Sequence, residues 1–148
     1  KDSSKSLLSA GFVLIFTIPL VRVMINSGVN SYDIVSMPIA MAEGIANFFG
    51  GIYPLFAPTI GAIGAFIAGS NTVSNLMLSQ FQFETAKILG LSGALMVALQ
   101  SVGAAAGNMI AIHNVVAASA TVGLVNREGD VIRITIIPLL YYLFLPLI

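Results

Sequence analysis

A short polar stretch, residues 69–75, separates two apolar stretches, and this break limits the possible folds of the chain more than any other feature. Residues 51–68 before it carry no charge, and the next charged residue after it is Glu84. Polar, non-helical backbone is tolerated within a bilayer only where protein or a water-filled cavity shields it. If the chain lies in a membrane, residues 69–75 must therefore face another part of the protein or a cavity.

The scarcity of charge places the chain in a membrane. Of its 148 residues, 57% are hydrophobic and 8% are charged, and the mean hydropathy is +0.99. A soluble domain carries about 25% charged residues, so this chain has too few to cover a water-facing surface. Six basic and six acidic residues give no net charge. This balance argues against a nucleic-acid partner, because phosphate binding needs a basic stripe.

Long apolar runs divide the chain into segments that predict an all-α membrane protein with transmembrane helices. The expected segments are a span at residues 7–25, an interfacial or short helix at 34–49, a re-entrant hairpin at 52–83, a broken span at 88–125 and a span at 131–148. The chain begins at Lys1 and lacks a signal-peptide pattern, so we expect it to be part of a longer protein.

The hairpin prediction rests on helix-breaking residues. Residues 52–83 include prolines and glycines at positions 54, 58, 61 and 64, which bend or break a helix. With the polar break and a return through residues 76–83, this spacing favours a hairpin that enters the membrane, turns at a polar tip and leaves on the same side. A single kinked span that ends in a polar loop is the alternative.

The segment at residues 88–125 is longer than one bilayer crossing needs, and small and polar residues divide it at 100–108. We expect a helix broken near its middle, with unwound backbone at residues 103–108. Many transporters build substrate and ion sites from breaks at membrane depth. The two polar breaks are therefore the candidate binding site.

Ser70, Asn71 and Thr72 are the candidate substrate-binding residues of the first break. Hydroxyl and carboxamide groups supply hydrogen-bond donors and acceptors without fixed charge. A helix that starts after the tip would direct its N-terminal amides at the site, which favours an anion. The same three residues also make an ordinary helix N-cap, so the tripeptide alone leaves both interpretations open.

The second break adds Gly103, Gly107 and Asn108 as candidate substrate-binding residues. The two glycines have the G-x-x-x-G spacing, and close helix packing is the alternative explanation for them. Asn108 offers a polar cap for a new helix.

His113 and Glu43 are the candidate proton-linked groups. His113 lies in an apolar run, and an ionisable group inside a membrane is a functional candidate. Histidine changes charge more readily near physiological pH than other side chains, although a hydrogen-bonded packing role is the alternative. Glu43 lies in the short segment at residues 34–49, where contact with water is the simpler explanation.

The sequence contains no catalytic, cofactor or metal-binding pattern. It has no nucleophile elbow, no H-E-x-x-H motif, no Gly-rich phosphate loop with lysine and no cofactor fingerprint. One histidine and no cysteine argue against a structural zinc site. We therefore expect neither an enzyme nor a bound cofactor or metal.

Two sequence blocks carry a resemblance to a known family. Residues 64–75 read GAFIAGSNTVSN, with FQF at 81–83, and residues 100–123 read QSVGAAAGNMIAIHNVVAASATVG, with NREG at 126–129. Both blocks resemble the lactate permeases, and the second is similar to the C-terminal region of that family. The resemblance covers residues 60–148 well and the first third of the chain weakly.

The resemblance implies that residues 1–148 are the C-terminal part of a membrane transport domain. Such a protein takes up L-lactate and related 2-hydroxy monocarboxylates such as glycolate, coupled to protons, across a bacterial inner membrane. The wider ion-transporter superfamily is built from inverted repeats, each with a re-entrant hairpin bearing a Ser-Asn-Thr tip and a broken helix. The chain would then be one half of an inverted-repeat transporter, and it would need the bilayer and the remainder of its parent.

Two other functions stay open. A sodium-coupled carboxylate symporter would use the same tip residues, because their oxygens also suit Na⁺. A membrane scaffold or assembly subunit would use Gly103 and Gly107 to pack helices and the polar breaks as helix caps. Substitution of the polar residues would then change assembly without changing the affinity for any ligand.

Overall fold

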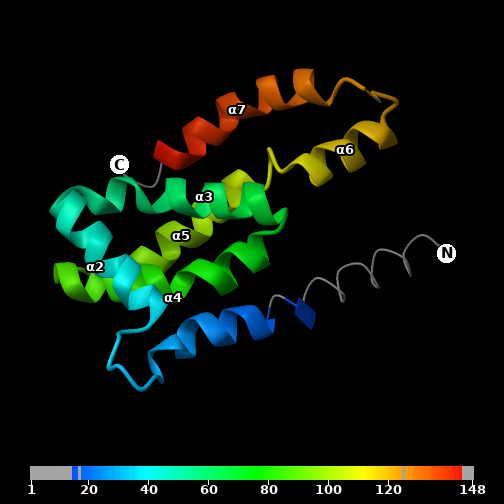
Figure 1. The fold of residues 1–148 in the computed structure, drawn as a ribbon. Coiled ribbons are helices and arrows are strands. Elements are labelled where there is room, and N and C mark those ends of the chain that lie inside the picture. Colours follow the sequence, from blue (N-terminus) through cyan, green and yellow to red (C-terminus); the bar gives the residue numbers. More distant parts are fainter. Residues whose placement is uncertain (1–14, 17, 125, 145–148) are drawn as a thin grey trace.

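The computed structural model describes residues 15–16, 18–124 and 126–144. Every regular element in these residues is a helix, which confirms the all-α prediction (Figure 1). Residues 15–16 and 18–25 are helical. The elements that follow are η1 (Asn26–Gly28), α2 (Met37–Phe49), η2 (Gly50–Leu55), α3 (Ala57–Ala68), α4 (Asn71–Leu89), α5 (Gly93–Gly107), α6 (Ile112–Thr121) and α7 (Glu128–Phe144).

Helices α3 and α4 form a hairpin with a very short turn. α3 ends where Gly69 adopts a left-handed φ of +66°, a conformation that favours glycine. Ser70 then caps α4, because its Oγ accepts a hydrogen bond from the Val73 N–H at 3.3 Å. The polar character of this stretch thus both ends one helix and starts the next.

The polar tip is shorter than the sequence indicated. We expected a tip at residues 69–75 and a return through residues 76–83. Only Gly69 and Ser70 lie outside the two helices, because Asn71 already begins α4, and α4 continues to Leu89. Most of the polar stretch is therefore the first turn of a helix.

Helix α5 runs parallel to α3 and packs tightly against it. Pro58 faces Gly103 and Ala62 faces Gly107, so the two helices run in the same direction. A Cβ atom at Gly103 would lie 1.8 Å from the Pro58 carbonyl oxygen, and one at Gly107 would lie 2.1 Å from that of Ala62. Glycine is required at both positions, because only the absence of a side chain allows the backbones to approach so closely.

The break in the second predicted span lies further along the chain than we expected. The sequence indicated unwound backbone at residues 103–108, but α5 stays helical to Gly107 and α6 begins at Ile112. The two glycines remain helical because they serve the close contact with α3. Residues 108–111 form the break, and the helices on either side of it bend by 43°.

A hydrophobic core holds the base of the hairpin to α2 and α5. Tyr53, Phe81 and Met96 are buried there together with Ala42 of α2 and Ala86 of α4. α2 therefore packs at the end of the hairpin away from the Gly69 turn (Figure 1).

In the described residues no single helix is both long and apolar enough to cross a bilayer. Two bent pairs together reach that length and hydropathy: Met37–Leu55 with Ala57–Ala68, bent by 97°, and Gly93–Gly107 with Ile112–Thr121. Residues 7–14 and 17 of the expected span at 7–25 lie outside the described residues, as do residues 145–148 of the one at 131–148.

Candidate functional site

The two polar breaks meet in space. The side-chain amide of Asn114, in the first turn of α6, donates to Asn108 Oδ1 at 2.8 Å and lies 3.2 Å from the Asn108 carbonyl oxygen. The same nitrogen lies 3.5 Å from the carbonyl oxygen of Gly69 at the hairpin tip. Asn114 therefore links the tip to the break between α5 and α6.

The imidazole of His113 covers the turn of the hairpin. A Cβ atom built on Gly69 would lie 1.5 Å from His113 Nε2, so the ring occupies the space that any other side chain at position 69 would need. His113 itself is exposed on its outer side. The ionisable ring therefore packs against the Gly69 turn on one side and is exposed on the other.

The tip residues present polar groups of different kinds. The Ser70 hydroxyl caps α4 and is half-buried. Asn71 Oδ1 accepts a hydrogen bond from Asn75 Nδ2 at 2.9 Å, and Thr72 is exposed. Asn75 Oδ1 is buried and has no hydrogen-bond partner among the described residues, so it leaves an unused acceptor one turn below the tip.

Four helix ends converge at this place. α3 and α5 end there at Ala68 and Gly107, and α4 and α6 begin there at Asn71 and Ile112. The N-terminal ends of α4 and α6 carry partial positive charge and unpaired amides. The C-terminal ends of α3 and α5 carry partial negative charge at the same place, so the convergence offers both amide donors and carbonyl acceptors to a small polar ligand.

The structure does not bring every predicted site residue to this place. Gly103 and Gly107 are buried in the α3–α5 contact, where packing accounts for both. Glu43 is exposed on α2, and this helix packs at the end of the hairpin away from the tip (Figure 1). Ser70, Asn71, Thr72, Asn108 and His113 do gather at the tip and the break.

Asn114 is a residue that the site prediction missed. It follows His113 directly in an otherwise apolar run, residues 109–116. A second polar residue next to a candidate proton carrier in such a run is a signal that it has a partner to hydrogen-bond. One of its partners, the Gly69 carbonyl oxygen, lies 45 positions earlier in the sequence, so sequence spacing gives no sign of this contact.

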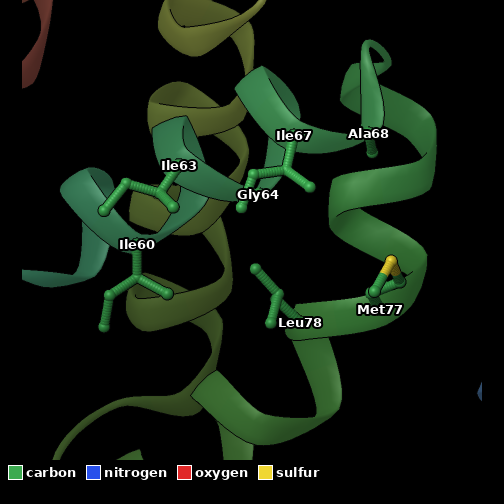
Figure 2. Close-up of a pocket in the computed structure, with 7 residues that line it drawn as sticks. All are labelled: Ile60, Ile63, Gly64, Ile67, Ala68, Met77 and Leu78. Atoms are coloured by element: carbon green, nitrogen blue, oxygen red, sulfur yellow. The ribbon is translucent and has the colours of Figure 1, made fainter.

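A separate pocket of about 310 Å³ lies on the outer face of the hairpin (Figure 2). Its lining is entirely apolar: Ile60, Ile63, Gly64, Ile67, Ala68, Met77 and Leu78. A carboxylate would find no hydrogen-bond donor on these side chains. The pocket is therefore no part of the polar site.

Comparisons with known proteins identify the family. A family model described as L-lactate permease matches residues 1–148. The chain is 42% identical over 129 residues to a putative L-lactate permease of Haemophilus influenzae, covering 87% of this chain and 23% of that protein. It is 32% identical over 136 residues to an L-lactate permease of Escherichia coli, covering 92% of this chain and 22% of that protein. A glycolate permease of Escherichia coli is 32% identical over 130 residues, or 88% of this chain and 21% of that protein.

No solved structure matches the chain. The chain spans less than a quarter of the length of these three relatives, with shares of 21–23%. The resemblance seen in the sequence and the expectation that the chain is no enzyme are both confirmed by the family match. The chain belongs to the L-lactate permease family, which is a family of membrane transporters.

Proposed function

We propose that this chain is part of a proton-coupled symporter for L-lactate and related 2-hydroxy monocarboxylates such as glycolate, in a bacterial inner membrane. The observation that carries the proposal is the meeting of the hairpin tip and the broken helix through Asn114, Gly69 and Asn108. The names of the relatives, L-lactate permease and glycolate permease, support this substrate class.

The chemistry of the site suits such a substrate. L-lactate carries one carboxylate and one neighbouring hydroxyl. In our proposal the carboxylate binds the hydroxyls of Ser70 and Thr72 and the N-terminal amides of α4 and α6. The substrate hydroxyl pairs with the side chains of Asn71 and Asn108, which offer both donors and acceptors.

His113 is the proton-linked group of this proposal. Its ring lies against Gly69, next to the proposed carboxylate position. A proton on the imidazole would offset the negative charge of the substrate and so link the two binding events. Glu43 is a weaker candidate, because α2 lies at the far end of the hairpin (Figure 1).

A bilayer and further parts of the parent protein complete the proposal. Large apolar side chains are exposed on several helices, among them Phe48 at 82%, Ile67 at 73% and Ile137 at 71%. Lipid or other transmembrane helices would cover these surfaces. We propose that the hairpin is re-entrant and that the chain is one of two inverted repeats, each of which supplies half of the binding site.

The test is radiolabelled L-lactate uptake into proteoliposomes that hold the full-length permease, driven first by a pH gradient and then by a sodium gradient. We expect uptake with the pH gradient and its loss in the double variant Asn71→Ala with Asn108→Ala. Asn47→Ala, on the exposed face of α2, is the control and should transport normally. Wild-type uptake in the double variant would overturn the site assignment.

A sodium-coupled carboxylate symporter is the second candidate. The unused buried oxygen of Asn75, near Asn71 Oδ1, favours it, because Na⁺ binds neutral oxygen ligands. Uptake driven by a sodium gradient and indifferent to the pH gradient would replace the first proposal by this one.

A further inference from the structure

A continuous row of hydrogen bonds crosses the interface between the hairpin and α5, and the proposed substrate site does not use it. The Tyr53 hydroxyl donates to Gln82 Oε1 at 2.5 Å, and Gln82 Nε2 donates to Gln100 Oε1 at 3.0 Å. Gln100 Nε2 donates to Ser74 Oγ at 3.2 Å, and Ser74 Oγ donates to the Gly61 carbonyl oxygen at 2.9 Å. We call these five residues the buried network.

The buried network joins four elements in the interior of the helix bundle. Tyr53 belongs to η2, Gly61 to α3, Ser74 and Gln82 to α4, and Gln100 to α5. The four side chains are each 0% exposed. A shift of the hairpin along α5 would leave buried amides unpaired, which is unfavourable in an apolar interior.

Stability alone does not require such a network. Apolar side chains of similar size fill a helix interface at least as well, since both partners of a buried polar pair can often be replaced without loss. What polar pairs add is a single defined register between the packed helices. Gly61 reinforces that register, because a Cβ atom there would lie 2.4 Å from the carbonyl oxygen of Gln100.

The network ends directly beneath the hairpin tip. Ser74 lies one helical turn after Ser70, and its N–H donates to the Ser70 carbonyl oxygen at 3.0 Å. Gln100 lies on α5, whose end leads into the break at Asn108. The same hydrogen bonds therefore connect α4, one turn below the first polar break, to α5, about two turns before the second.

We propose that Gln82 and Gln100 are positioning residues, which fix the register of the hairpin on α5 and thereby the distance between the Ser70 tip and the Asn108 break. Neither residue touches the substrate. An effect of these residues on L-lactate transport rests on the proposed function. The fixed distance between the Ser70 tip and the Asn108 break does not. The hairpin and α5 then move as one body during transport, and any change of access to the site has to come from other elements.

The test compares variants of the full-length permease. Gln82→Met with Gln100→Met removes both central partners and so leaves few unpaired groups, which favours retention of the fold. Ser74→Ala is a second variant that removes the last two links of the network, the one from Gln100 Nε2 and the one to the Gly61 carbonyl oxygen. Gln80→Met is the matched control, because Gln80 lies on α4 two residues before Gln82 and pairs with Glu84 instead of the network.

The first readout is a distance and needs no substrate. Spin labels are placed at Thr72, beside the tip, and at Leu95, near the start of α5, both of which are exposed. The helical rise separates the two sites by about 20 Å. We expect a narrow distance distribution in the wild type and in Gln80→Met, and a broader one in the double methionine variant and in Ser74→Ala.

The second readout is the KM for L-lactate uptake at equal amounts of folded protein. We expect KM to rise on the order of 10-fold or more in the double variant, because small misplacement of binding groups has large effects, and to stay unchanged in Gln80→Met. A distance distribution that stays narrow in both network variants would overturn the proposal. A broadened distribution in a permease that transports no hydroxy acid would support the positioning role and refute the proposed function instead.

Discussion

His113 Nε2 occupies the position next to Gly69 where a side chain would start: a Cβ atom at Gly69 would lie 1.5 Å from it. Gly69 also has a φ of +66°. Two independent constraints thus require glycine at the tip, one from the backbone conformation and one from the neighbouring ring.

These two constraints can be separated by substitution. Gly69→Ala should abolish L-lactate uptake, because the methyl group displaces the imidazole and the left-handed conformation costs about 1 kcal/mol for alanine. Gly90→Ala is the control: Gly90 ends α4 with a φ of +67°, and a Cβ there would meet no other part of the described chain within 4 Å. The Gly90→Ala variant should show only the cost of the left-handed backbone conformation, measured as a small fall in thermal stability, and its L-lactate uptake should stay normal. Equal effects of the two substitutions would contradict the contact with His113.

Asn114→Leu should weaken substrate binding without unfolding the protein. The substitution removes the amide that joins Gly69 to Asn108, so we expect a KM for L-lactate raised roughly 10-fold, on the scale of one lost hydrogen bond of about 1 kcal/mol plus misalignment of the site. Asn114→Asp tests the donor, because a carboxylate keeps the shape and can no longer donate. An unchanged KM in both variants would mean that the link does not hold the site together.

Ser70 and Ser92 form a natural pair for separating capping from binding. Each caps a helix through a 3.3 Å hydrogen bond, to the Val73 N–H in one case and the Leu95 N–H in the other. Replacement of either by alanine should cost about 1 kcal/mol of stability. Only Ser70→Ala should also raise KM, because Ser92 lies at the other end of α5. Thermal unfolding measures the loss of stability in each variant, and uptake measures the KM for L-lactate. A normal KM in Ser70→Ala would mean that Ser70 only caps α4 and does not bind the substrate.

Gly103→Ala should destabilise the bundle, whatever its effect on transport. The added methyl group would lie 1.8 Å from the Pro58 carbonyl oxygen, and overpacking of this kind costs about 1–3 kcal/mol. Gly44→Ala on α2 is the control, since a Cβ there meets no other part of the described chain within 4 Å. It should be neutral or stabilising by up to ~1 kcal/mol, because alanine favours helix more than glycine does. Thermal unfolding in detergent measures both, and an equally stable Gly103→Ala protein would contradict the close α3–α5 packing.

His113→Gln should separate substrate exchange from proton-driven accumulation. Glutamine keeps hydrogen-bonding capacity and cannot take up the proton, so we expect loss of uptake driven by the pH gradient while lactate counterflow continues. Glu43→Gln should leave both activities intact, because α2 lies away from the site. The reverse pattern, with coupling lost in Glu43→Gln alone, would move the proton-linked role to Glu43.

The sequence predicted the helical class, the chain reversal and the second break, because these depend on local features: scarce charge, helix-breaking residues and small polar clusters. It misplaced the break at residues 103–108, because glycines that would weaken an isolated helix are supported here by the contact with α3. Asn114 escaped prediction, because its importance depends on the carbonyl of Gly69, which is distant in sequence.

The pairing of Gln82 with Gln100 could not be predicted from the sequence either. Both residues stand in the blocks that resemble the lactate permeases, yet nothing in their spacing tells that they share a hydrogen bond. Their pairing follows from the antiparallel packing of α4 on α5, which only the long-range contacts define.

The parallel course of α3 and α5 matches the lengths of two segments of the chain. Ala62 contacts Gly107, and seven residues further along each segment Gly69 contacts Asn114. The two lengths are matched, so a residue added to the helical stretch of α3 after Ala62 would shift the Gly69 end by about 1.5 Å and turn it by about 100° relative to Asn114. A residue added between Leu89 and Gly93, in the connection from α4 to α5, would change neither length. Insertions and deletions should therefore be tolerated in that connection, whereas the two measured stretches can change only together.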